Sequence, residues 1–95
     1  ACNMINIFLK SASEINSDIA KRMAGIRKRR KISQKELAKR SGVSLGSLKR
    51  FEQTGEISLI SLTKLAMALG LENELDGLFA DVPFDSIEEV INAQD

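Results

Sequence analysis

Two helix-capping units stand back to back between Ser33 and Gly55, in "SQKELAKRSGVSLGSLKRFEQTG", and they restrict the fold more than any other feature. Ser33 is a preferred N-cap residue, and Glu36 at the third helical position completes the pattern of a capping box. Gly42 ends a helix easily because glycine adopts the left-handed conformation without a steric penalty. Ser44 and Gly55 repeat this start and stop, so the stretch predicts two short helices joined by a tight turn.

Apolar residues at helical spacing lie on both sides of this pair and predict an all-α fold. On the N-terminal side, Ser17 is expected to cap a helix over about 18–30. On the C-terminal side, Ser58 is expected to cap a helix that ends at Gly70. The residues expected on the buried stripe of that helix are Leu59, Leu62, Leu65, Ala66 and Leu69.

Two shorter helices are predicted in the remaining chain. One spans about 72–79, and the other begins at Ser86, because Pro83 interrupts the chain between them. No alternation of apolar and polar residues follows residue 10, so no strand is predicted there.

The length of 95 residues indicates one domain. We divide the chain into an N-terminal arm at 1–16, a helical domain at 17–80 and a short helical C-terminal extension at 81–95. The residues before Met4 are interpreted as part of a tag.

The formal net charge of +1 conceals a segregation of charge along the chain. Residues 17–50 contain twelve Lys or Arg against two acidic residues, a net charge of +10. Residues 51–95 contain one Lys against ten acidic residues, a net charge of −9. A basic half of this kind indicates a polyanionic partner, with an ordinary solvated surface as the alternative.

Composition argues against an enzyme and against a metal site. The chain has no His and a single Cys, so common metal ligands and acid–base groups are missing. No nucleophile stands beside a base, and there is no glycine-rich phosphate loop. No apolar run approaches the ~20 residues of a membrane helix, and no signal peptide is evident. We therefore expect a cytoplasmic protein without a metal or another cofactor.

The segment 33–55 meets the requirements of a helix pair that reads DNA. In such a pair the first helix crosses the phosphate backbone and the second enters the major groove. Gly42 provides the tight turn, and Ala38 is small enough for the point where the helices cross. The apolar residues expected to lock the angle between them are Leu37, Val43, Leu48 and Phe51.

This segment resembles the helix-turn-helix of the Cro/C1-type (XRE) repressor family, which includes the phage lambda-type repressors. The resemblance rests on Gln34, Leu37, Ala38, Gly42, Val43, Ser44, Leu48 and Glu52, and it covers about residues 18–79. It implies a five-helix lambda-repressor-like domain. It also implies a sequence-specific transcriptional regulator, a repressor that binds a pseudo-palindromic operator as a dimer through the major groove of double-stranded DNA.

The resemblance implies roles for single residues as well. The positions that face the major groove in this family correspond here to Ser44, Leu45, Gly46, Lys49 and Arg50. The positions near phosphates correspond to Gln34, Ser47 and Gln53, of which Gln34 also braces the second helix. Arg27 and Glu52 match a structural pair that ties the first helix to the end of the reading helix, with a direct DNA contact by Arg27 as the alternative.

Side-chain chemistry narrows the base readout. Leu45 can offer only an apolar contact to a thymine methyl group. Gly46 is explained by a close approach of the backbone to the groove or by simple tolerance in the first helical turn. Arg50 can bind guanine O6 and N7 through a bidentate fork or can bind a phosphate, and Lys49 can reach either of them.

The basic run "RKRRK" at 27–31 and the basic first turn after Ser33 predict contacts with the phosphate backbone. The residues expected to make them are Arg29, Arg30, Lys31 and Lys35. Such contacts add affinity but read no sequence. A solvated helix end or a patch that docks a protein partner is the alternative.

The acidic C-terminal half carries more apolar side chains, between residues 71 and 91, than a small domain readily buries. This surplus predicts a homodimer, with a tail folded back on its own core as the alternative. The run "SLGSLKRFEQTGEISL" also resembles regulators encoded beside Hip-type kinase toxins. That resemblance implies, as an alternative function, an antitoxin-like subunit that binds such a kinase and autoregulates its operon.

Overall fold

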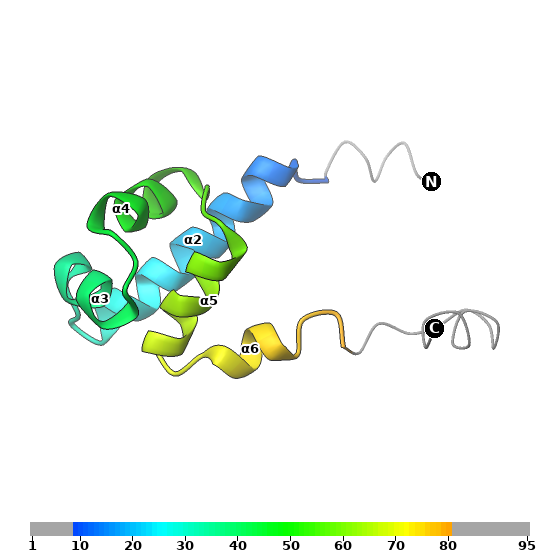
Figure 1. The fold of residues 1–95 in the computed structure, drawn as a ribbon. Helices are drawn as coiled ribbons and strands as arrows, with labels where there is room; N and C mark the ends of the chain where they lie inside the picture. Colours follow the sequence, from blue (N-terminus) through cyan, green and yellow to red (C-terminus); the bar gives the residue numbers. More distant parts are fainter. Residues whose placement is uncertain (1–8, 81–95) are drawn as a thin grey trace.

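The computed structural model describes residues 9–80, which form five helices and no strand (Figure 1). The helices, labelled as in Figure 1, are α2 (Ala12–Arg29), α3 (Gln34–Ser41), α4 (Leu45–Thr54), α5 (Leu59–Ala68) and α6 (Glu72–Asp76). The predicted all-α class is confirmed for this part of the chain. Residues 1–8 and 81–95 lie outside the described residues, and so do the predicted C-terminal extension and its helix from Ser86.

The first described helix begins six residues earlier than the sequence analysis predicted. Ser11, and not Ser17, is its N-cap: the Ser11 hydroxyl accepts from the Glu14 N–H at 3.1 Å, and the Ser11 N–H donates to the Glu14 carboxylate at 3.2 Å. These reciprocal bonds satisfy two backbone donors that a helix start leaves free, so the helix extends to the earlier serine. The predicted start at residue 18 is therefore wrong.

Serine side chains cap the next three helices as predicted. The hydroxyls of Ser33, Ser44 and Ser58 accept from backbone N–H groups in the first turns of α3, α4 and α5. At α3 only half of the predicted capping box forms: the Ser33 hydroxyl accepts from the Glu36 N–H at 3.0 Å, whereas the Glu36 carboxylate accepts from Arg40 at 3.3 Å. The last described helix, α6, ends at Asp76, three residues before its predicted end.

One apolar core holds these helices together. α2 packs against α4, and α5 packs against α3 and α6. The largest fully buried side chains are Leu37, Leu48, Phe51 and Leu65, and Ala20, Val43 and Leu69 complete the centre. In Figure 1, α3 and α4 lie near the C-terminal half of α2, and α6 continues from the end of α5 that is remote from α4. None of the described helices combines the length and apolar character that crossing a membrane requires.

The outer face of α5 carries several exposed apolar side chains. Leu65, Ala66 and Leu69 are buried as expected, but Leu59 is 69% exposed, so its predicted burial is wrong. Leu59 is the first residue of α5 and lies at the rim of a shallow apolar hollow next to Ile57, rather than under another helix. Two further apolar residues of α5, Ile60 and Met67, are also exposed.

Candidate nucleic-acid interface

α3 and α4 form the predicted helix pair, and residues 42–44 connect them. Gly42 turns the chain in the left-handed conformation (φ 78°), and its N–H donates to the Ala38 carbonyl at 3.0 Å. The side chains behind this turn are all buried, namely Leu37, Ala38, Val43, Leu48 and Phe51. A tight turn and a close-packed rear face give the pair a defined crossing angle, which a helix that enters a groove needs.

The outward side of α4 carries the residues predicted to read bases. Gly46, Lys49 and Arg50 are exposed on it. Within residues 9–80, and apart from the adjacent residues and the backbone of α4 itself, no atom lies within 4 Å of the place that a Cβ on Gly46 would take, so the fold does not require a glycine there. Ser44 uses its hydroxyl to cap α4 and to donate to the Ser47 hydroxyl at 2.9 Å, and Leu45 is half-buried against the core. Lys49 and Arg50 are thus the exposed cationic side chains of α4.

A buried network braces α4 from behind. The Arg27 guanidinium of α2 donates to both carboxylate oxygens of Glu52, from Nε at 2.8 Å and from Nη2 at 3.0 Å. Gln34 of α3 donates to the same carboxylate at 2.9 Å. Arg27, which is only 7% exposed, also donates to the Ile32 carbonyl at 2.8 Å. One carboxylate therefore joins α2, α3 and α4, and the predicted pair Arg27 and Glu52 is present as a buried bidentate ion pair.

The basic run at 27–31 does not form one continuous surface. Arg27 is buried, whereas Arg29 is exposed. Arg30 donates to the Leu69 carbonyl at the end of α5, so it ties the end of α2 to α5. Lys31, two residues after the end of α2, has a left-handed conformation (φ 58°) that is uncommon for a residue with a side chain. The three residues of this run that are predicted to contact phosphates therefore differ in their local environment, namely Arg29, Arg30 and Lys31.

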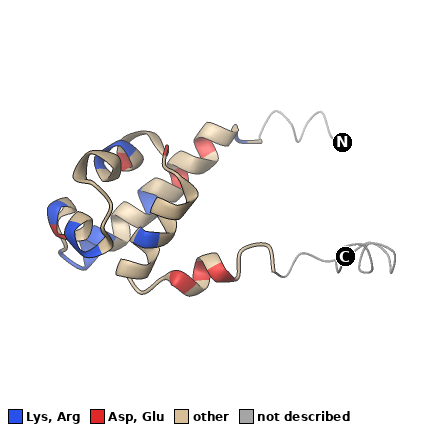
Figure 2. Ribbon diagram, viewed as in Figure 1, with Lys and Arg blue, Asp and Glu red and all other residues tan. Residues whose placement is uncertain are grey.

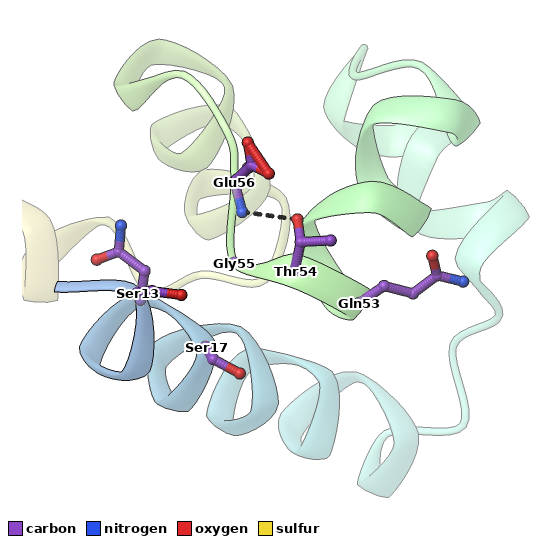
Figure 3. A pocket seen from close by; sticks show the side chains of 7 residues that line it. Ser13, Ser17, Gln53, Thr54, Gly55 and Glu56 are labelled. Carbon is purple, nitrogen blue, oxygen red and sulfur yellow. Dashed lines mark hydrogen bonds between the residues drawn. The ribbon is translucent and has the colours of Figure 1, made fainter. Parts of the chain in front are cut away.

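The other residues predicted to contact phosphates lie at the edges of the helix pair. Lys35 is exposed in the first turn of α3, and Ser47 and Gln53 are exposed on α4. Gln53 lines a polar groove between the end of α4 and the start of α2, together with Ser13 and Ser17 (Figure 3).

Close to this groove, the ammonium group of Lys10, which precedes α2, donates a hydrogen bond to the Asp18 carboxylate on α2, and this contact holds the pKa of Asp18 below its usual value.

Sequence reasoning missed one residue of this region, Glu56. The Arg50 guanidinium donates from Nη2 to the two Glu56 carboxylate oxygens at 3.1 and 3.4 Å. The two residues are six positions apart, a spacing that does not face along a continuous helix. No sequence pattern used above could therefore have indicated this pair.

Charge is separated in space as it is along the chain. Figure 2 shows Lys and Arg gathered over α3, α4 and the C-terminal half of α2. The acidic residues of the short helix α6, Glu72, Glu74 and Asp76, lie away from that cluster. The helix pair thus stands within a basic surface, as a site for a polyanion requires.

Comparison with known families agrees with this geometry. A helix-turn-helix family model matches residues 17–72, which is more than half of the chain, so the protein belongs to this family, the XRE or Cro/C1 type. It is a DNA-binding transcription regulator of the helix-turn-helix class. No curated protein and no solved structure gives a significant match to the chain.

Proposed function

We propose that this protein is a repressor without catalytic activity that binds a pseudo-palindromic operator as a homodimer, with α4 of each copy in the major groove. The observation that carries the proposal is the carboxylate of Glu52. It holds α4 to α2 and α3 through Arg27 and Gln34, at 2.8 to 3.0 Å, while Lys49 and Arg50 extend from the other side. Because its rear is fixed, α4 can present these side chains to base edges with little loss of conformational entropy on binding.

Within this proposal Arg50 reads a base, and Lys35 contributes charge alone. Arg50→Ala is expected to weaken binding to an operator selected from random duplexes by about 1–3 kcal/mol and to relax the preference at one base pair. Fluorescence anisotropy with the selected duplex, its single-base variants and a scrambled duplex measures both effects.

The matched control for Arg50 is Lys35→Ala, which removes an exposed cation from α3. It is expected to weaken the selected and the scrambled duplex equally and to lower the salt slope by about one. An equal loss on both duplexes for Arg50→Ala would instead assign Arg50 to a phosphate.

The proposed dimer is supported by exposed apolar side chains on the C-terminal half of the domain. Ile60 and Met67 lie on one side of α5, about two turns apart, with exposures of 67% and 61%. Leu78 and Phe79, which follow α6, are exposed as well. Exposed apolar side chains of this kind suit a two-fold contact, in which the same patch of each copy meets its equivalent.

Met67→Glu is expected to convert the dimer to a monomer, because two carboxylates would meet near the two-fold axis. Sedimentation velocity at micromolar concentration measures the change. Ser13→Glu places the same charge on an exposed polar position of α2 and is expected to leave the dimer intact. A wild-type protein that sediments as a monomer on its selected operator would contradict the dimer.

The alternative of an antitoxin-like subunit that binds a Hip-type kinase rests on the resemblance of the run "SLGSLKRFEQTGEISL". The acidic, apolar C-terminal tail that would hold the kinase lies mostly outside the described residues. Within residues 9–80 no feature favours it over a regulator that acts without such a partner.

A further inference from the structure

The left-handed turn that follows α4 brings the carboxylate of Glu56 close to Arg50 on the same helix. Gly55 ends α4 with φ 82°, and the next residue, Glu56, reaches back six positions to Arg50. The contact joins Arg50 Nη2 to both Glu56 carboxylate oxygens, at 3.1 and 3.4 Å. Glu56 is therefore part of the outward side of α4 although it lies outside the helix.

Backbone contacts fix where Glu56 stands. The Thr54 hydroxyl donates to the Arg50 carbonyl at 2.7 Å and accepts from the Glu56 N–H at 3.1 Å, the second of which is drawn in Figure 3. Gly55 itself is buried, and its Cα faces the backbone of Asn16 and Ser17 on α2. The place of the Glu56 backbone relative to Arg50 is thus set by the fold, which keeps the carboxylate within reach of the guanidinium.

Folding does not explain a carboxylate at this place. The side chains of Arg50 and Glu56 are 67% and 62% exposed, and ion pairs that exposed add little to stability. A free carboxylate beside a bound duplex also opposes the attraction of the phosphates. The carboxylate of Glu52, by contrast, is turned inward and takes part in the buried network. Neither stability nor general attraction to DNA therefore explains why a carboxylate stands beside Arg50, so Glu56 has to have another role.

We propose that Glu56 is a positioning residue that raises the sequence specificity of Arg50. The inference rests on the proposed function, because it requires that α4 reads bases. Glu56 binds Arg50 through Nη2, and Nε and Nη1 make no hydrogen bond within residues 9–80. The guanidinium is thereby held in one orientation with donors left for a base edge.

The ion pair of Arg50 and Glu56 affects non-specific binding to phosphates and specific binding to a base differently. A phosphate of non-specific DNA has to draw Arg50 away from Glu56, and this cost reduces non-specific binding. A guanine edge at the right place meets the guanidinium in the orientation that Glu56 maintains, so specific binding gains from the reduced rotamer entropy. Glu56 thus lowers non-specific affinity more than specific affinity.

The experiment compares the selected operator duplex with a scrambled duplex of the same composition. Glu56→Gln keeps the size of the side chain and removes its charge. It is expected to tighten binding to the scrambled duplex by up to about fivefold, with less change on the selected duplex. It is also expected to make the salt slope on scrambled DNA steeper by about one. The specificity ratio, which is the dissociation constant for the scrambled duplex divided by that for the selected duplex, therefore falls.

Three further variants separate positioning from general charge. Glu56→Asp keeps the charge but shortens the reach, and the ratio is expected to fall as well. Glu36→Gln breaks the comparable exposed pair with Arg40 on α3 (3.3 Å) and is expected to leave the ratio unchanged. In an Arg50→Ala background, Glu56→Gln is expected to have no further effect on the ratio.

The outcomes distinguish the inference from the function on which it rests. If Glu56→Gln tightened both duplexes by the same factor, or if Glu56→Asp behaved as wild type, Glu56 would act as a general repulsive charge and the inference would be overturned. If the wild-type protein bound the selected and the scrambled duplex equally, the proposed function would fail, and the inference with it.

Discussion

Replacement of Gly55 with alanine is expected to lower the free energy of unfolding by about 2–5 kcal/mol. Gly55 has φ 82°, a conformation that costs a residue with a side chain about 1–2 kcal/mol. An added Cβ would also stand 2.7 Å from the Asn16 carbonyl carbon and 2.8 Å from the Ser17 nitrogen. These are backbone atoms of α2 and cannot rotate away, so the end of α4 has to move off α2, which adds about 1–3 kcal/mol. Urea unfolding followed by circular dichroism measures the loss.

Gly42→Ala is the matched control for this substitution. Gly42 ends α3 in the same left-handed conformation (φ 78°), but among the described residues, its two neighbours in the chain apart, no atom lies within 4 Å of its added Cβ. Only the conformational cost of about 1–2 kcal/mol applies there. Equal losses in the two variants would show that the contact between Gly55 and α2 contributes nothing, which would contradict the geometric argument.

The limits of the central helices could be predicted because each depends on residues within one turn. Ser44 and Gly55 act on backbone groups a few positions away, and sequence alone specifies such contacts. The start of α2 was misplaced because Ser11 and Ser17 both fit an N-cap, although Glu14 three positions after Ser11 was a visible signal for the earlier one. The exposure of Leu59 could not be predicted from periodicity, because it depends on which distant element covers the first turn of α5.

Some contacts of the candidate site could also be predicted from the sequence, and others could not. The pair of Arg27 and Glu52 spans 25 positions, so it followed from the family resemblance and not from any spacing rule. Glu56 meets Arg50 only because the chain reverses at Gly55, and neither helical spacing nor charge pattern encodes that approach. Contacts made across a turn require the path of the backbone, which sequence patterns describe poorly.

Loss of the Glu52 carboxylate is expected to produce the other large effect, a decrease of about 3–5 kcal/mol in the free energy of unfolding for Glu52→Gln. The side chains of Arg27 and Glu52 are each only 9% exposed. Without the carboxylate, the Arg27 guanidinium remains buried with no opposite charge beside it, which is the costly state of a broken internal ion pair. Chemical denaturation measures the decrease. Glu36→Gln, which breaks the exposed pair with Arg40, serves as the control, with an expected loss of about 0.3–0.5 kcal/mol.

The double variant Arg27→Met/Glu52→Leu separates the role of this network in folding from its role in DNA binding. Apolar replacement of both partners leaves no buried charge, so most of the lost stability is expected to return. Affinity for the selected operator is not expected to return, because Gln34 loses the carboxylate through which α3 holds α4 at 2.9 Å. A double variant that bound the operator as tightly as the wild-type protein would show that the network contributes to stability and not to DNA binding. Stable protein with weak binding would instead show that the orientation of α4, and not merely its presence, is what Glu52 maintains.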